Sequence, residues 1–426
     1  MSDLFWPGDE RAGALLGDAE LLRTMEAVES AWLEALVAGG IAPISARHPV
    51  RGLVGARDVD AVARAAEAGG NPVIPLVGLL RDRLPAESAR WLHRGLTSQD
   101  VFDTALVLLL RDVLDRLDTE LRRQVRELLR LTTAYAETAE VGRTLTQHAV
   151  PITFGLKSAG WLTGVLDATV AVERARSGLA AQLGGAAGTA AATVELALLQ
   201  GHPEPIEATW RLIETTATAL GLPARAPWHT SRAPLTDVAD ALVTCTDAYG
   251  HLAADVTTLS RPEIGELAEG SGGGSSTMPH KRNPALSVLI RRAALAGPGL
   301  AATVHLAAAT TVDERPDGAW HAEWAALRDL GRRTVVAASQ TSDLLADLRV
   351  DGERMAANLD RAEGVRAEQQ SMAALVGAEP SATYLGATPR WIEAAARRAE
   401  TYLTADGPDG SGGPGGLDGP DEKETT

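Results

Sequence analysis

The sequence predicts an all-α protein in three parts, built around a central bundle of long helices. Aromatic residues make up 4% of the 426 residues, so the apolar core should be mainly aliphatic. Apolar residues recur at helical spacing over long stretches, and convincing alternating patterns typical of strands are nearly absent. The longest stretch predicts one helix from Asp103 to about Ala139. A helix of ~35 residues is ~52 Å long, which favours a bundle shared with partner subunits.

The first part, residues 1–103, predicts an N-terminal helical domain. Its clearest element is a helix from Asp18 to Gly39, where apolar side chains recur at helical spacing. The pair Gly39–Gly40 ends that helix. The helices predicted within residues 46–95 are short, because glycine and proline interrupt them at Gly69–Pro72, Pro75 and Pro85.

The second part, residues 104–346, predicts the central helical bundle. In its long helix an apolar stripe that includes Leu106, Leu110 and Val113 lies opposite charged residues such as Arg111. Further helices are predicted at 151–180, 189–201, 206–221, 234–260, 284–310 and 319–346.

The third part, residues 347–404, predicts a small C-terminal helical domain. Helices are expected around 352–361, near 366–376 and around Pro389–Leu403. Residues 405–426 are rich in glycine, proline and acidic residues, so we expect a disordered tail there.

Charge and cysteine content restrict the possible functions. The formal net charge is −16, the pI is near 5.1 and no basic stretch offsets them, which argues against nucleic-acid binding. An anionic substrate would therefore need local cations.

The only cysteine, Cys245, lies in an apolar helical run and predicts a buried, unreactive thiol without a disulfide in the chain. Met1-Ser2-Asp3 lacks the basic region of a signal peptide and no apolar run reaches ~18 residues, so we expect a cytoplasmic protein without a membrane span.

The segment Gly270–Pro284, GSGGGSSTMPHKRNP, points most directly to function. Its glycine run cannot hold one backbone conformation without outside contacts. Two hydroxyl groups follow, on Ser275 and Ser276, and Met278–Pro279 is a candidate hinge for a lid. The segment therefore predicts a mobile loop that delivers serines to a site.

Cations and a helix start complete the same segment. Lys281 and Arg282 precede Asn283–Pro284, which is typical of an N-cap followed by the first helical residue. A helix N-terminus has free N–H groups and about half a positive charge, so it suits a carboxylate or phosphate. The alternative is a Gly/Ser linker followed by an ordinary helix, but linkers do not usually end in an ordered anion site.

The eleven residues Gly274–Pro284 resemble the signature GSSxMPxKxNP of the fumarase/aspartase superfamily. The resemblance covers about residues 3–376 and returns weakly at 380–403. It implies the three-domain, all-α fold of that superfamily and a homotetramer in which each active site draws on three subunits. No metal or cofactor is expected, since no His/Cys/carboxylate cluster has ligand spacing. Relatives usually have further small-domain helices after a segment like Ser371–Leu375, so the C-terminal domain is apparently shortened.

A second cluster, His93–Ala105, leads into the long helix and contains TSQDVFDTA. One interpretation is that Thr97 or Ser98, together with Asp100, caps this helix. The other is that hydroxyls and helix-start N–H groups hold a substrate carboxylate. This motif is similar to the corresponding motifs of the cycloisomerase and adenylosuccinate branches of the superfamily. By resemblance, the substrate-binding residues of this cluster are His93, Thr97, Ser98 and Gln99.

A third cluster, Gly142–Gly155, contains polar residues ahead of an apolar helix. Thr144 and Gln147 must satisfy backbone groups or face a ligand, while a lone His148 is more typical of a packed core. By resemblance, all three face the substrate. Many fumarase-type and adenylosuccinate-type lyases have a histidine where this chain has Leu145, which cannot transfer a proton. This departure weakens the adenylosuccinate interpretation and fits the cycloisomerase branch, which also lacks that histidine.

Two later segments supply cations and hydrogen-bond donors. Trp228–Arg232 precedes a helix, and Glu314–Trp324 is unusually rich in functional side chains, although a solvated charged turn is its simpler interpretation. The second segment resembles the cycloisomerase form ERxxGxWHxEW. Arg315 is then expected to bind a carboxylate as a fork, with Glu323 orienting His321. The substrate-binding residues predicted here are Thr230, Arg232, Arg315 and His321.

The predicted chemistry is proton transfer at a carbon next to a carboxylate. It passes through a dianionic aci-carboxylate and needs a proton carrier and cations on the carboxylate oxygens. By family match Ser275 is the candidate carrier, with Ser276 as the alternate. Lys281 and the helix N-terminus would lower the pKa of the hydroxyl only inside a closed, dry site. Lys281 and Asn283 would hold the carboxylate, and Met278 belongs to the same substrate-binding loop.

The resulting hypothesis is an enzyme similar to the 3-carboxy-cis,cis-muconate cycloisomerases of aromatic (protocatechuate) degradation. One carboxylate of the polycarboxylate substrate would add to the substrate's own double bond and give a carboxymuconolactone. An adenylosuccinate-like or other succinyl lyase that releases fumarate is the alternative. A catalytically silent helical homologue is a further alternative, suggested by the shortened C-terminal domain.

Overall fold

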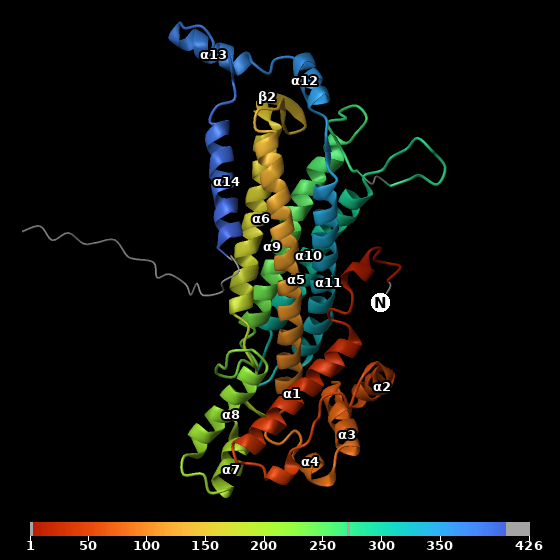
Figure 1. Cartoon of the computed structure of the whole chain (residues 1–426), viewed down its shortest axis with the longest axis vertical. Helices are drawn as coiled ribbons and strands as arrows, with labels where there is room; N and C mark the ends of the chain where they lie inside the picture. Colours follow the sequence, from red (N-terminus) through yellow and green to blue (C-terminus); the bar gives the residue numbers. More distant parts are fainter. Residues whose placement is uncertain (1–2, 271–272, 406–426) are drawn as a thin grey trace, which may run out of the picture. The chain divides into compact units, whose positions relative to one another are not determined.

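The computed structural model describes residues 3–270 and 273–405 and is mostly helical, which confirms the predicted all-α fold (Figure 1). Its described residues form two compact units, one within Met1–Leu121 and Asp167–Arg349, the other within Arg122–Leu166 and Val350–Thr426. The predicted tail beyond Ala405 and two loop residues, Ser271 and Gly272, lie outside the described residues. The division into three domains stays a prediction.

The first unit contains most of the helices, and α5 and α6 continue from one unit into the other. Its N-terminal elements are 3₁₀ helices at Asp9–Ala12, Ile44–Ala46 and Ala56–Asp58, and α1 (Asp18–Ala38), α2 (Val59–Gly69), α3 (Val73–Arg83), α4 (Ala86–Trp91) and the first part of α5 (Ser98–Ala134). The later ones are the end of α6 (Phe154–Ser177), α7 (Ala191–Leu199), α8 (Pro205–Ala219), α9 (Ala233–Leu259), the short strand β3 (Leu267–Ala268), α10 (Ala285–Ala309) and α11 (Gly318–Ala346).

Helix α10 packs against both α9 and α11 in the core of the first unit. Small residues let α9 and α10 approach closely, since a Cβ atom at Gly250 would lie only 2.5 Å from the Cβ atom of Ala294. By length and composition α10 is apolar enough to cross a membrane, yet only 28% of its apolar window is buried in the described chain. Leu295 and Leu306 are 81% and 66% exposed. Much of the apolar surface of α10 is therefore uncovered.

The second unit combines the end of α5, a β-hairpin and the start of α6. Strands β1 (Ala139–Thr144) and β2 (Gln147–Thr153) pair antiparallel, and α12 packs against β1. After the short strand β4, the C-terminal part is helical, and the Arg122 guanidinium lies over the Tyr402 ring at 4.9 Å. These last elements are β4 (Arg349–Val350), α12 (Gly352–Arg361), α13 (Ala367–Val376) and α14 (Thr388–Thr404).

The sequence pattern does not predict this hairpin. The long helix expected to reach Ala139 ends at Ala134, and the helix expected from residue 151 begins at Phe154. The strand register shifts between Val141 and Arg143, and such a bulge interrupts the alternation of side chains that identifies a strand. The other predicted helices are confirmed, with boundaries shifted by a few residues.

Gly155, at the start of α6, lies against the end of α5 without room for a side chain. A Cβ atom there would lie 2.6 Å from the Ala136 Cα atom and 2.8 Å from the Thr132 carbonyl oxygen. We expect Gly155→Ala to lower the free energy of unfolding by ~1–3 kcal/mol, measured by urea denaturation, because backbone atoms must move. Gly160→Ala is the matched control, since no described atom outside its own stretch of helix lies within 4 Å of the added Cβ. It should be neutral or stabilising, and equal losses in both variants would contradict the explanation.

Candidate active site

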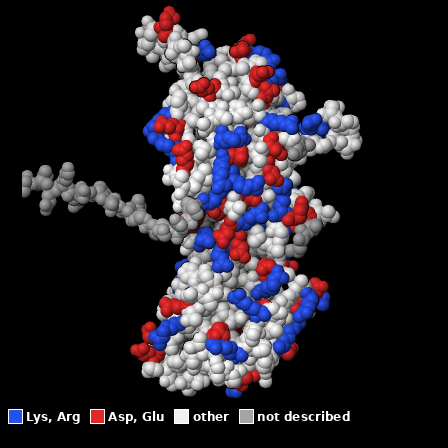
Figure 2. Space-filling view, in the orientation of Figure 1, with Lys and Arg blue, Asp and Glu red and all other residues white. Residues whose placement is uncertain are grey.

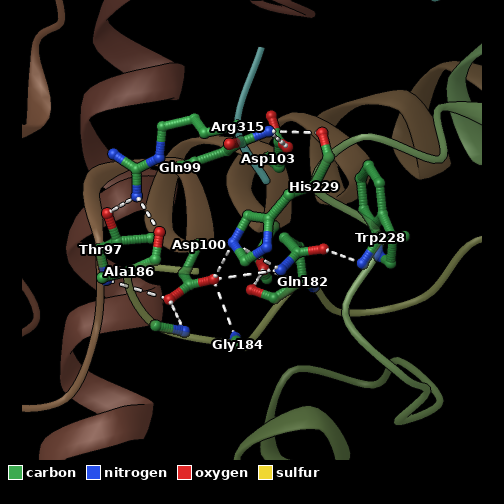
Figure 3. Close-up of polar contacts among 12 residues, drawn as sticks. Thr97, Gln99, Asp100, Asp103, Gln182, Gly184, Ala186, Trp228, His229 and Arg315 are labelled. Carbon is green, nitrogen blue, oxygen red and sulfur yellow. Dashed lines mark hydrogen bonds and ion pairs between the residues drawn. The ribbon is translucent and has the colours of Figure 1, made fainter. Parts of the chain in front are cut away.

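A buried carboxylate, Asp100, organises the polar cluster at the start of α5 (Figure 3). The backbone N–H of Thr97 donates to the Asp100 carboxylate at 3.0 Å. Asp100 therefore caps α5, which agrees with one of the two interpretations of the sequence. Its other partners, at 2.8 to 3.1 Å, are the backbone N–H groups of Gly184 and Gly185 and the side chains of Gln182 and His229. A carboxylate without exposed surface is stable only with several such donors.

The turn that carries two of these donors requires glycine. Gly185 has a φ of +70°, and a Cβ atom at Gly184 would lie 2.6 Å from the Cβ atom of Pro227. The Gln182 side-chain oxygen accepts a hydrogen bond from the Trp228 backbone N–H at 2.5 Å. The glycine turn, the start of α5 and the segment before α9 therefore support one another.

Beside this cluster, two carboxylates share one buried cation. The Arg232 guanidinium forms an ion pair with Asp103 at 2.6 Å and a second with Glu323, and all three side chains are buried. Its five N–H groups are directed at these two carboxylates and at the His229 carbonyl oxygen. The prediction that Arg232 binds substrate conflicts with this pairing, so we assign it a structural role.

Gln99 also points inward rather than to a ligand. Its side chain is fully buried and donates to Asp103 at 3.0 Å and to the His229 carbonyl oxygen at 2.9 Å. The Trp320 indole N–H donates to Asp103 at 2.8 Å. Gln99 therefore belongs to the support beneath the start of α5, and its predicted contact with substrate conflicts with this burial.

Glu323 does not orient His321, and that prediction is wrong because Glu323 pairs with Arg232. The exposed His321 instead lies between two carbonyl oxygens, with Nδ1 3.0 Å from Asp317 and Nε2 2.8 Å from Gly70. Burial raises the pKa of Glu323 to about 7, although the charge of Arg232 opposes the change. One cation cannot balance two buried carboxylates, so the proton is favoured on one of them.

Arg315 is a cation without a carboxylate partner among the described residues. Its guanidinium contacts the Thr97 hydroxyl and lies 3.4 Å from the Ala186 carbonyl oxygen (Figure 3). Thr97, Ser98 and Thr230 are all partly exposed. Because neither partner of Arg315 is charged, its positive charge remains available to an anion beside the Thr97 hydroxyl group. Substrate binding by these residues stays a prediction.

His93 lies four residues before Thr97 and contacts a residue that the sequence reasoning missed. Its Nδ1 atom is 2.5 Å from the carboxylate of Glu29 in α1. The Glu29 side chain is fully buried, whereas that of His93 is 18% exposed. The available signal was the position of Glu29 on the apolar stripe of α1, next to Val28 and four residues after Met25. An acidic residue on a buried helix face needs a partner.

The described part of the signature loop is closed at its base by pairing between Gly273 and Asn283. Each backbone N–H donates to the other residue's carbonyl oxygen at 2.8 Å, and the Asn283 side chain donates to the Gly274 carbonyl oxygen at 3.2 Å. Ser276, Met278 and Lys281 are exposed. The Ser275 Oγ atom accepts hydrogen bonds from the backbone N–H groups of Met278, at 3.1 Å, and Thr277, at 3.4 Å. Two N–H donors on one oxygen can stabilise negative charge that develops there.

The N-terminus of α10 is not free, contrary to the expectation from the sequence. The helix begins at Ala285, and Glu269 accepts from the backbone N–H groups of Leu286 and Ser287 at 3.1 and 2.7 Å. The Ser287 hydroxyl donates to the same carboxylate at 2.7 Å. The chain's own Glu269 therefore occupies the place predicted for a substrate carboxylate. Glu269 is a second residue that sequence reasoning missed.

Thr144, Gln147 and His148 lie at the ends of β1 and β2 that flank the hairpin turn, rather than at the entry to a helix. All three are exposed, and the turn residues Leu145 and Thr146 have φ values of +49° and +68°. Positive φ is strained for both residue types. The Leu145 side chain is 94% exposed. The hairpin thus presents these polar groups at its tip, away from its own core.

Within the first unit, the signature loop and the Asp100 cluster lie at opposite ends of α10. The loop leads into the first residue of the helix, Ala285, whereas just after its last turn the Thr311 hydroxyl donates to the Thr230 carbonyl oxygen. A helix of 25 residues is ~37 Å long. One chain therefore does not bring Ser275 next to Arg315.

Figure 2 shows Lys and Arg side chains interspersed with Asp and Glu on the drawn face, despite the net charge of −16. Local cations such as Arg315 therefore compete with an unfavourable overall charge when an anion binds.

Comparison with known proteins identifies the family. A family model described as Lyase matches residues 62–296. The chain belongs to the fumarase/aspartase superfamily of lyases. It is 41% identical over 362 residues to nitrosuccinate lyase from Streptomyces davaonensis, which covers 82% of this chain and 75% of that protein. It is 39% identical to 3-carboxy-cis,cis-muconate cycloisomerase from Bradyrhizobium diazoefficiens, covering 83% of this chain and 77% of that protein.

The fold agrees with the same superfamily. The crystal structure of 3-carboxy-cis,cis-muconate lactonizing enzyme from Pseudomonas putida matches with a TM-score of 0.81 and 30% identity, covering 92% of this chain and 97% of that one. These comparisons confirm the predicted superfamily and support an enzyme of the cycloisomerase type over a silent helical homologue.

The raised pKa of Glu323 predicts a specific pH dependence of stability. The folded-state pKa of about 7 exceeds the ordinary 4.5, so between these values the folded chain holds a proton that the unfolded chain has lost. This contribution to stability therefore falls by up to ~3 kcal/mol as pH rises through that window. Glu323→Gln removes this pH-dependent contribution. The Tm of the variant minus the Tm of the wild type should therefore rise between about pH 5 and pH 7.5.

Glu393→Gln is the control for this measurement, because its side chain is 55% exposed. Its Tm difference from the wild type should stay constant over the same pH range. Parallel Tm curves for Glu323→Gln and the wild type would contradict the shifted pKa.

Proposed function

We propose that this enzyme transfers a proton at a carbon next to a carboxylate of a small polycarboxylate, and that its substrate is 3-carboxy-cis,cis-muconate. The observation that carries the proposal is the loop GSSTMPHKRNP, in which two backbone N–H groups point at the Ser275 oxygen. The cycloisomerase relatives and the match to the lactonizing enzyme support the choice of substrate.

In the proposed reaction one substrate carboxylate adds to the substrate's own double bond. A C–O bond forms, and the electron pair of the double bond moves into the carboxylate on the neighbouring carbon, which gives an aci-carboxylate. Ser275 then delivers its hydroxyl proton to that carbon, and a carboxymuconolactone results. The N–H groups of Thr277 and Met278 stabilise the oxyanion left on Ser275.

Cations hold the substrate in this proposal. Lys281 and Asn283 bind the carboxylate that becomes the aci-carboxylate, and Arg315 binds a second carboxylate near Thr97. Lys281 is exposed and Arg315 is only partly buried, so closure of the loop would exclude water and strengthen both contacts. No metal or cofactor enters this reaction, and the proposed setting is the cytoplasm.

We propose a homotetramer with shared active sites. The ~37 Å between the loop and the Asp100 cluster supports this proposal, because one chain does not bring Ser275 next to Arg315. The uncovered apolar side chains of α10, including Leu295 and Leu306, supply a surface for that contact. The exposed hairpin tip at Thr144–His148 is the third contribution in this proposal.

A second candidate substrate is nitrosuccinate, because the nitrosuccinate lyase relative is 41% identical. Here ionised Ser275 would take a proton from the carbon next to one carboxylate. The resulting aci-carboxylate would then break the neighbouring C–N bond, so that nitrite leaves and fumarate forms. The adenylosuccinate-like alternative is disfavoured, since Leu145 cannot transfer a proton; fumarate release from adenylosuccinate would revive it.

A direct assay separates the two substrates. We expect loss of the ultraviolet absorbance of 3-carboxymuconate, without nitrite release from nitrosuccinate. Ser275→Ala should lower kcat by ~10²–10⁴-fold, because it removes the proton carrier. Ser276→Ala is the matched control and should keep most of the activity, since Ser275, not Ser276, receives the two N–H bonds. Nitrite release alone would establish the second candidate, and an active Ser275→Ala enzyme would exclude Ser275 as the carrier.

Shared sites predict complementation between inactive variants. Mixed assemblies of Ser275→Ala and Gln147→Ala chains should recover part of the activity, because some sites receive an intact loop and an intact hairpin. Mixtures of Ser275→Ala with Lys281→Ala should recover none, since both changes lie in the same loop of each chain. Verified mixed tetramers of the first pair without activity would contradict shared sites.

A further inference from the structure

The contact between Glu29 and His93 joins a fully buried acid to a partly exposed base. Glu29 Oε1 is 2.5 Å from His93 Nδ1, and the second carboxylate oxygen, Oε2, is buried without a hydrogen-bond partner among the described residues. A carboxylate can only accept, so Nδ1 carries a proton. The other ring nitrogen, Nε2, points away from Glu29, and no partner for it is present in the described chain.

The backbone around His93 is held in a strained conformation. His93 has a φ of +64°, which is uncommon for a residue with a side chain. The Trp32 indole N–H donates to the Arg94 carbonyl oxygen at 2.7 Å, and Arg81 donates to the Leu92 carbonyl oxygen at 2.9 Å. These bonds fasten the segment on both sides of His93, so the imidazole is presented in one orientation just before Thr97. Strain of this kind marks functional sites.

Charged groups from three helices act on the imidazole. Burial lowers the pKa of His93, but the charge of Glu29 and its hydrogen bond outweigh burial, so the pKa is raised. Arg81 in α3 opposes this effect, and Asp100 in α5 adds to it. The imidazolium form is therefore favoured, with a second N–H donor directed away from Glu29.

We infer that Glu29 is a positioning residue that keeps His93 as a cation, with its Nε2–H group available to a carboxylate of the substrate. This inference rests on the proposed function for the substrate class, a small polycarboxylate. His93 and Arg315 then supply two separate cations near the start of α5, and each binds a different carboxylate. Glu29 makes no contact with substrate and acts through His93.

Stability alone does not explain a glutamate at this position. A buried carboxylate with one oxygen unpartnered loses its hydration without full compensation. Glutamine has the same shape and could still accept the hydrogen bond from Nδ1 without the cost of burying a charge. Glu29→Gln should therefore leave the Tm unchanged or raise it, while it lowers the pKa of His93. Loss of function without loss of stability is the expected sign of a positioning residue.

The experiment compares Glu29→Gln and Glu29→Asp with the wild type in the full-length chain. The His93 ring signals, assigned by their absence in His93→Gln, are titrated by NMR, and binding of tricarballylate is measured by calorimetry from about pH 5.5 to about pH 8. Trp32→Phe is the matched control, since it removes a bond to the same segment without touching the Glu29–His93 pair.

We expect the titration midpoint of His93 to fall in Glu29→Gln and to be largely retained in Glu29→Asp. Tricarballylate should bind Glu29→Gln about tenfold more weakly at about pH 7.5 and nearly normally at about pH 5.5, where His93 is protonated without help. Trp32→Phe should show no such pH-dependent difference. In turnover assays KM should rise more than kcat falls.

An unchanged His93 midpoint in Glu29→Gln would overturn the inference, as would a loss of tricarballylate binding that acid does not restore. Failure of the wild type to bind tricarballylate would overturn it as well. These readouts need no turnover, so they separate this inference from the identity of the reaction. A chain inactive on both proposed substrates would still support the role of Glu29 if acid restores binding to Glu29→Gln.

Discussion

The burial of the Asp100 carboxylate is the constraint that fixes the geometry around the start of α5. A carboxylate without exposed surface is tolerable only when several donors converge on it. Those donors come from the helix start itself, from the glycine turn and from His229, which are far apart in the sequence. The donors that surround this one carboxylate therefore hold three segments in fixed positions relative to one another. Thr97 acquires a fixed position from this arrangement, and Arg315 is attached to its hydroxyl.

The two arginines near this cluster show how the same residue type takes opposite roles. Arg232 is enclosed by Asp103 and Glu323, so its charge is more than balanced, and the excess acid raises the pKa of Glu323. Among the residues that the structure describes, Arg315 contacts a hydroxyl and a carbonyl oxygen and no carboxylate, so its charge is unbalanced. An unbalanced, partly exposed cation attracts an anion, whereas a balanced, buried one holds the fold together.

This distinction also explains which parts of the fold and of the candidate site could be predicted from the sequence alone. Helix positions are local properties of periodicity, so nearly all of them were predictable, except where the bulge between Val141 and Arg143 hid the hairpin. The signature loop was recognisable because its residues are contiguous. The partners of Arg232 were not recognisable from the sequence, since Asp103 and Glu323 lie 129 and 91 positions away along the chain. Residue type predicts a charge, but only the fold decides whether a carboxylate of the same chain already neutralises it.

The length of α10 links the chemistry to assembly. A rigid helix keeps its two ends apart, so the loop that carries Ser275 and the cluster that carries Arg315 cannot meet by any small motion within one chain. The same helix leaves apolar side chains such as Leu295 uncovered, and an exposed apolar patch favours association with another molecule. An association of copies that buries α10 would satisfy both requirements at once. In that proposed arrangement subunit contact would be a condition for catalysis, because Ser275, the proposed proton carrier, and Arg315, the proposed substrate-binding cation, would belong to different chains.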